Sequence, residues 1–263
     1  MNCKLTALAT AVSLSFSGIV LADTAATEAA ADNALSSIGA YNVADPTYMS
    51  RIDQEGNSNT ARVTQQRERE VSLVNQKGDG QSANVEQKGW GSFSRVSQTG
   101  NWNDVKVSQG QSGDYGSSYN RAQATQYGYG NSVKSSQTGK SNASVVTQGK
   151  GYAYSSGNEA FITQSGENNK HFADQKGNYG LSRVTQAGIG HEAYLTQGGT
   201  GNESYITQNE AANGGDLSHY AVVSQDGSYN KSYVDQTNPS IAGVAYVTQS
   251  GAHNIARTTQ TRF

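Results

Sequence analysis

Residues 192–208 have the sequence EAYLTQGGTGNESYITQ, in which two alternating segments end in glutamine and flank a turn containing glycine and asparagine. In each segment the residues two and four places before the glutamine are apolar or small, and Thr and Tyr lie between them. A period of two is typical of a β-strand with one buried face. The stretch therefore predicts a strand, a turn and a second strand.

The same pattern recurs along the chain when each repeat glutamine is numbered as position 0. Position −2 is Val, Ile or Leu in fourteen of eighteen units, and the glutamines are 11 residues apart except at four insertions. Odd-numbered units mostly have Gly at +2, and even-numbered units mostly have Asn at −6. Two successive units therefore form one repeat of about 22 residues. The repeat glutamines are Gln54, Gln65, Gln76, Gln87, Gln98, Gln109, Gln126, Gln137, Gln148, Gln164, Gln175, Gln186, Gln197, Gln208, Gln225, Gln236, Gln249 and Gln260. The marking asparagines are Asn59, Asn103, Asn131, Asn158, Asn202, Asn230 and Asn254.

A repeat of this length predicts an all-β fold, a two-sheet parallel β-solenoid of about nine 22-residue strand-turn-strand repeats. We expect the glutamines and asparagines to form structural ladders, each amide bonding to its copy in the next repeat. An 11-residue period is also found in right-handed coiled coils. Frequent Gly, and Val and Thr in place of Ala, Leu and Glu, disfavour a helix.

The ends and the composition of the chain predict a secreted protein. Residues 1–22 resemble a secretory signal peptide, with Lys4 before an apolar run and a small-residue cleavage site at Ala22. Residues 23–47 carry no repeat and are predicted to be a flexible leader, which leaves 48–263 as the repeat domain. The single cysteine, Cys3, falls in the signal, so the mature chain is expected to hold no disulfide. With a net charge of −2 and no basic block, a nucleic-acid partner is not expected.

The motif Gln-x4-Asn-x5-Gln, as in Gln54, Asn59 and Gln65, resembles the repeat of the curlins. These proteins are the secreted subunits of curli, the functional amyloid fibres of biofilms of Gram-negative bacteria. The resemblance covers about residues 48–263, although Ser, which usually stands at −6 of the first strand in curlins, is replaced in most repeats here. It implies export through the outer-membrane curli secretion channel, assembly into an extracellular fibre on the cell surface, and two kinds of binding partner, further copies of the chain and another curlin subunit.

The last strand predicted from the sequence, 254–260, keeps the full pattern apart from Thr258, and no polar capping repeat follows it. Uncapped solenoid ends leave strand edges that pair with other chains. We expect rung-on-rung addition, with residues 50–65 of one copy meeting residues 245–260 of the next. Two alternatives stay open. A minor curlin that nucleates a separate major subunit is suggested by the basic Arg257 and Arg262, and an ice-binding solenoid by the frequent Thr at −1.

No catalytic constellation is recognised, because the acidic residues are dispersed and no Ser has a convincing His and Asp partnership. We therefore expect no enzymatic activity and no cofactor. His191 and His219 share an inward position in successive repeats. They could bind a metal or sense pH, or they could simply be polar residues at a position that Asn occupies in other repeats. The run 67–70, Arg-Glu-Arg-Glu, is predicted to be a solvated turn.

Aromatic side chains at −3 are predicted to point outward and to stack between neighbouring strands, which usually stabilises a sheet. A lateral contact for bundling or adhesion is the alternative role. The residues concerned are Phe172, Tyr194, Tyr205, Tyr233 and Tyr246.

Overall fold

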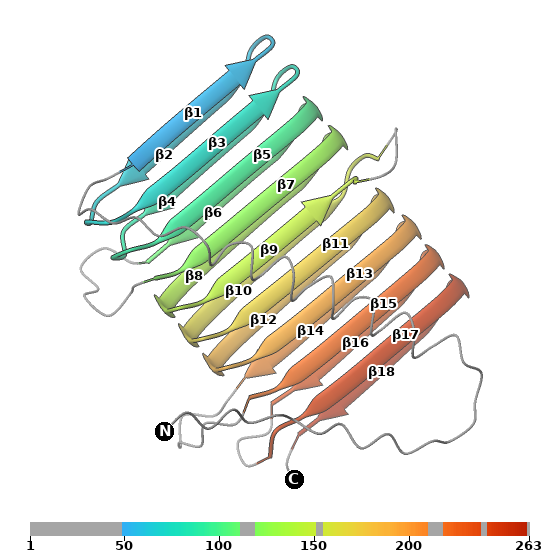
Figure 1. Cartoon of the computed structure of the whole chain (residues 1–263). Helices are drawn as coiled ribbons and strands as arrows, with labels where there is room; N and C mark the ends of the chain where they lie inside the picture. The colour runs from blue at the N-terminus through green and yellow to red at the C-terminus, as the bar shows by residue number, and fades with distance from the viewer. Residues whose placement is uncertain (1–48, 111–118, 151–154, 210–217, 238–240, 262–263) are drawn as a thin grey trace, which may run out of the picture.

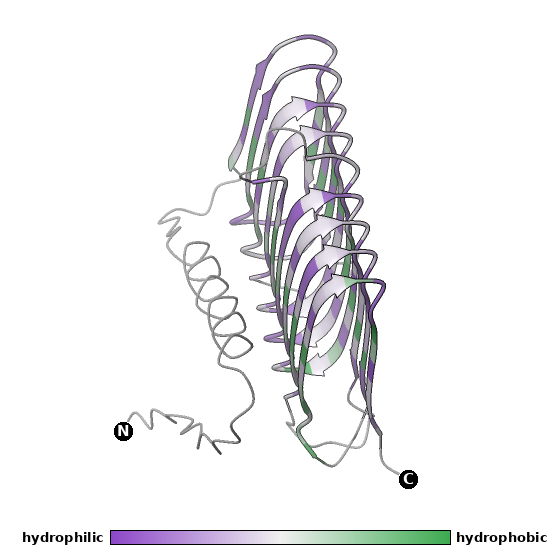
Figure 2. Cartoon of the chain, turned by 90° about the vertical axis from the view of Figure 1, so that its right-hand side faces the viewer, coloured by the Kyte–Doolittle hydropathy of each residue, from purple (hydrophilic) through white to green (hydrophobic). Residues whose placement is uncertain are grey.

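The chain folds into two parallel β-sheets that face each other in a flattened stack (Figures 1 and 2). A computed structural model describes residues 49–110, 119–150, 155–209, 218–237 and 241–261, and within these ranges every named element is a strand. The four insertions of the repeat fall largely on the gaps between these ranges, and the predicted signal and leader lie outside them. The predicted two-sheet parallel β-solenoid is confirmed.

Odd-numbered strands form one nine-stranded sheet, called the odd sheet here, and even-numbered strands form the other, the even sheet. One odd strand and the even strand after it make one rung. The odd sheet contains, in order, β1 (Met49–Glu55), β3 (Val71–Lys77), β5 (Phe93–Asn101), β7 (Arg121–Tyr129), β9 (Ala143–Gln148), β11 (Lys170–Asn178), β13 (Glu192–Thr200), β15 (Tyr220–Ser228) and β17 (Val244–Ala252). The even sheet contains β2 (Thr60–Gln65), β4 (Ser82–Gln87), β6 (Asp104–Gln109), β8 (Ser132–Lys140), β10 (Glu159–Glu167), β12 (Leu181–Ile189), β14 (Glu203–Asn209), β16 (Lys231–Gln236) and β18 (Ile255–Gln260).

The strands pair in the register that the glutamine spacing predicts. Gln76 of β3 pairs with Gln54 of β1 and with Gln98 of β5, and every other strand pair also places glutamine against glutamine. Because a slip of one residue would turn the apolar positions outward, burial of one face fixes this register. Each column of side chains therefore holds the same repeat position in all nine rungs.

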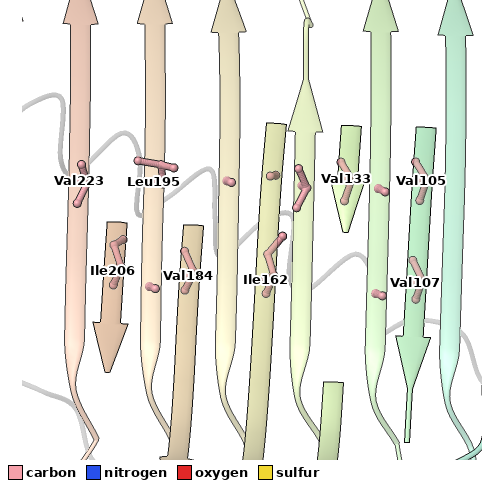
Figure 3. Packing of buried hydrophobic residues seen from close by; sticks show 14 of the residues in the cluster. Val105, Val107, Val133, Ile162, Val184, Leu195, Ile206 and Val223 are labelled. Atoms are coloured by element: carbon pink, nitrogen blue, oxygen red, sulfur yellow. The ribbon is translucent and has the colours of Figure 1, made fainter. Parts of the chain in front are cut away.

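The core is a thin layer of small and branched side chains between the two sheets (Figure 3). It comes from positions −4 and −2, as in Val105 and Val107 of β6, which are at most 1% exposed. Leu195 of the odd sheet and Ile206 of the even sheet, both labelled in Figure 3, belong to this one buried cluster. Figure 2 shows apolar residues running as bands through the stack, with polar residues on either side. Since no single rung can enclose such a layer, each rung depends on its neighbours for burial.

Glycine at +2 of the odd strands allows the inner turns to stack at the strand spacing. Gly78 has a φ of 123°, a conformation that L-residues with a side chain rarely adopt. A Cβ atom on Gly78 would also collide with the carbonyl oxygen of Gly100 in the next rung. Steric exclusion from the neighbouring turn therefore accounts for glycine at this position.

Candidate functional site

The repeat glutamines form two continuous ladders of hydrogen bonds between the sheets. In every pair of adjacent rungs the Nε2 of one glutamine donates to the Oε1 of the next, over 2.6 to 3.0 Å. The second amide hydrogen crosses to the opposite sheet, as from Gln76 to the carbonyl oxygen of Thr60 at 3.1 Å. Burying an amide without partners costs about 1 to 3 kcal/mol, so this double donation keeps the buried glutamines stable.

Both ladders run in the same direction. All donors point towards the C-terminal rung, from Gln54 to Gln76 in the odd sheet and from Gln65 to Gln87 in the even sheet. The first rung of the solenoid consequently presents amide oxygens and the last rung presents amide N–H groups. The two ends are therefore chemically different and mutually complementary.

The inner turn carries a third ladder, built from the asparagines at −6 of the even strands. The Oδ1 of Asn103 accepts the backbone N–H of Asn131 in the next rung at 3.1 Å. The Nδ2 of Asn131 donates to the carbonyl oxygen of Tyr127, four residues earlier, at 2.7 Å. One side chain thus closes its own turn and binds the turn above it.

A matching ladder at the outer corner was missed by the sequence analysis. Asn120, Asn142 and Asn169 occupy −6 of the odd strands, and each Oδ1 accepts the backbone N–H of the next residue in this column, at 3.0 to 3.1 Å. The signal was present in the sequence, since these asparagines share one repeat position. It was obscured because residue types vary along the column, which holds Glu70 in the second rung.

Two histidines continue this outer ladder. The Nδ1 of His191 accepts the backbone N–H of His219 at 3.0 Å, and the Nδ1 of His219 accepts that of Gly243 at 2.9 Å. Because Nδ1 is the acceptor in both rings, this network assigns the ring proton to Nε2, and the Nε2 of His191 lies 3.1 Å from the carbonyl oxygen of Ala187. The rings stack with centroids 5.0 Å apart. The pair therefore takes the place of two asparagines.

Burial shifts the pKa of two groups, His171 and Glu70, far from the usual range. His171 faces inward at −4, and burial lowers its pKa to about 3. Burial raises the pKa of Glu70 to about 7, although its Oε2 accepts the backbone N–H groups of Gln66 at 2.8 Å and Arg67 at 3.1 Å. The prediction of a solvated turn at 67–70 is thus wrong for Glu70, since its register at −6 turns the side chain inward.

The end rungs expose side chains that are buried in every interior rung. Ile52, at inward position −2 of β1, is 42% exposed, whereas Val74 in the next rung is 2% exposed. Within the described residues, Gln54 and Gln65 accept no ladder bond, and Gln249 and Gln260 donate none to a further glutamine. Each end is therefore an unfinished copy of the interior.

The outward aromatics do not form one exposed surface. Phe172 and Tyr194 are 4% and 2% exposed and lie in a second buried cluster on the outer face of the odd sheet, so they offer no lateral contact in this structure. Tyr205 and Tyr233, on the even sheet, are half-buried and stack with ring centroids 5.2 Å apart. Tyr246 of β17 is 57% exposed.

Within the described ranges, no group of three or more His, Cys, Asp or Glu side chains is placed to hold a metal ion. The same part of the chain contains no helix long and apolar enough to cross a membrane. The ladders, the end rungs and the outer columns are thus the features from which a function can be argued. No protein-family model matches the chain, and a search of curated proteins finds no match.

Proposed function

We propose that this chain is a structural subunit of extracellular curli-type amyloid fibres, in which copies add rung on rung. The observation that carries the proposal is the complementarity of the two end rungs. Donors at one end and acceptors at the other would join in the same geometry that connects rungs inside the subunit. Unprotected strand edges of this kind favour pairing with another chain.

The join can be followed along the columns of the odd sheet. With β17 of one copy placed on β1 of the next, Val247 meets Ile52 and Gln249 meets Gln54. The Nε2 of Gln249 would then donate to the Oε1 of Gln54, as the Nε2 of Gln225 donates to Gln249 at 2.8 Å. Backbone pairing, apolar contact and ladder bond would all continue across the join.

The outer columns bring both favourable and unfavourable contacts to the join. Arg51 would lie against Tyr246, an arrangement already present where the guanidinium of Arg257 is 5.2 Å from the ring centroid of Tyr233. Arg62 would lie one strand spacing, about 4.8 Å, from Arg257, and like charges at that distance repel. Added salt should therefore accelerate elongation by screening this pair.

The resemblance to curlins supplies the cellular part of the proposal. A secreted chain would leave a Gram-negative cell through the outer-membrane curli secretion channel and assemble on the surface as biofilm matrix and adhesive fibre. The predicted signal at 1–22 and leader at 23–47 agree with this route. Its binding partners would be further copies of the chain and a second curlin subunit.

The test is to incubate chain lacking residues 1–22 and to follow thioflavin fluorescence and electron microscopy. Fibres with parallel strands perpendicular to the fibre axis are the expected result. A chain that stays monomeric for days refutes the proposal. Efficient seeding of a major curlin by trace amounts, with little self-assembly, would assign the minor, nucleating role instead.

A further inference from the structure

The outer face of the even sheet carries two adjacent columns without any carboxylate from β6 to β14. The column at −3 contains, in successive rungs, Lys106, Lys134, Phe161, Arg183 and Tyr205. The column at −1 beside it contains hydroxyl side chains throughout, namely Ser108, Ser136, Thr163, Thr185 and Thr207. We call these ten residues the cation–hydroxyl strip. It is bounded by Glu86 in β4 and Asp235 in β16, which stand at −1 in the flanking rungs.

The three cations of the strip are exposed and available. Lys106, Lys134 and Arg183 form no ion pair within 4.0 Å with any of the described residues, whereas seven other surface pairs are formed there. Between Glu86 and Asp235, the carboxylates beside the strip lie in the −5 column, as Asp104, Glu159 and Glu203. Glu203 pairs with Lys231 at 3.1 Å.

A groove of about 200 Å³ follows the middle of the strip. Lys134, Phe161 and Arg183 line one side, and Ser136, Thr163 and Thr185 line the other. Lys134 and Arg183 are two rungs apart, about 10 Å at the usual strand spacing. The groove thus offers a positive charge on either side of Phe161, beside a row of hydroxyl donors and acceptors.

We propose that the cation–hydroxyl strip binds an acidic polysaccharide, a polymer with carboxylate or sulfate groups on a hydroxyl-rich backbone. Lys134 and Arg183 would bind successive anionic groups through charge-assisted hydrogen bonds. The Ser and Thr column would bond to sugar hydroxyls along the chain. This inference concerns a face of the subunit, not its ends, and holds whether or not the chain polymerises.

The geometry favours a polysaccharide over a nucleic acid. Proteins that bind single-stranded nucleic acid rely on aromatic rings on which bases stack. In the strip, the guanidinium of Arg183 lies over the ring of Phe161, 5.3 Å from its centroid, and Tyr205 already stacks on Tyr233. A protein group thus already occupies one face of each ring, which leaves cations and hydroxyls as the main recognition elements.

The experiment measures binding of fluorescent alginate, a polyuronate, to the full chain in both the soluble and the pelleted fraction. The test variant is Lys134→Gln with Arg183→Gln. The matched control, Lys170→Gln with Lys176→Gln, removes the same charge from β11 of the odd sheet. Dextran serves as the neutral polysaccharide, and single-stranded DNA of equal charge as the polyphosphate.

We expect wild type and control to bind alginate with similar affinity, and the test variant to bind about tenfold more weakly, because two solvent-exposed charge contacts, each of modest strength, are lost. Binding should weaken with salt, and dextran should not bind. Equal losses in both variants would reduce the effect to net charge and overturn the proposal. So would unchanged binding by the test variant, or preferential binding of DNA over alginate.

Discussion

Replacing Ile52 by Lys should block assembly without unfolding the subunit. Ile52 is 42% exposed in the isolated solenoid, so a lysine there can reach solvent. In the proposed fibre, the same position would be enclosed between Val74 of its own chain and Val247 of the next copy. The substitution therefore separates the stability of the subunit from the stability of the join.

The size of the effect follows from the surface that the join would bury. Fully burying an Ile side chain contributes about 1.5 to 3 kcal/mol, so covering the exposed part of Ile52 contributes roughly 1 kcal/mol to each join. An unpaired ammonium group buried there costs several kcal/mol more, partly relieved if the Lys stem reaches the edge of the sheet. A loss of at least about 3 kcal/mol per join raises the critical concentration by about a hundredfold or more.

The assay compares the soluble concentration remaining at the end of assembly for wild type, Ile52→Lys and Ile189→Lys. Ile189 is 37% exposed at the end of β12, far from either end rung, so its substitution is the matched control. Ile52→Lys should keep the circular dichroism spectrum of the wild type. It should also cap only one end of wild-type seeds, because its own β17 and β18 remain intact. A folded Ile52→Lys that assembles at the wild-type critical concentration would refute rung-on-rung addition, as would equal inhibition by Ile189→Lys.

Three further predictions concern the stability of the solenoid itself. Gly78→Ala should destabilise it by about 3 kcal/mol or more, because the added methyl group meets the carbonyl oxygen of Gly100. The control is Gly130→Ala, where φ is 64° and no atom lies within 4 Å of the added methyl group, and it should cost about 1 kcal/mol. Equal losses of unfolding free energy in denaturant would contradict the steric explanation. His171 has a pKa of about 3 in the folded state and about 6.5 in the unfolded state, so the wild type should lose roughly 4 to 5 kcal/mol of unfolding free energy as pH falls from 6.5 towards 3. His171→Ser, which matches Ser144 in the preceding rung, should lose less over the same range. An unchanged acid transition in this variant would show that His171 does not cause the loss. Glu70 should make stability depend on pH in the opposite direction, since its folded pKa of about 7 exceeds the unfolded value of 4.5. Its contribution to stability is complete below pH 4.5 and is lost as pH rises through 7. Glu70→Gln should therefore raise the free energy of unfolding by about 1 to 3 kcal/mol at pH 8 and leave it unchanged at pH 4, which denaturant unfolding at the two pH values will test.

The sheets, the register and the core could be predicted because one short pattern determines all three. Val107 and Gln109 are buried for the same reason as Val85 and Gln87, since each column repeats one position. A period of two indicates which side chains share a face, and the 22-residue repeat brings equivalent strands together. No long-range information beyond periodicity was needed.

The outer-corner ladder was missed because the residue type changes along the column, although its Asn and His side chains accept a hydrogen bond at the same place. Asn169 and His191 present different atoms, Oδ1 and Nδ1, to the same backbone N–H position. Residue counting treats them as unrelated. A search for any short acceptor at −6 would have found the column.

Alternation could assign the face of a side chain but not its burial. Tyr194 and Tyr246 occupy the same outward column, yet the first is 2% exposed and the second 57% exposed. Glu70 shows the reverse error, because a run of four charged residues looks solvated while its register turns one carboxyl group inward. Packing against other parts of the molecule decides such cases, and a single column does not contain that information.

The shared direction of the glutamine ladders has a consequence for how the stack loses material. Aligned amides polarise one another, so a hydrogen bond in the middle of a long chain is stronger than one at its end. A join in the interior lies between long ladders on both sides, whereas the join of a terminal subunit is continued by only that one subunit on its outer side and is weaker. A filament built this way should shorten from its tips and resist severing, with the acceptor tip and the donor tip releasing subunits at different rates.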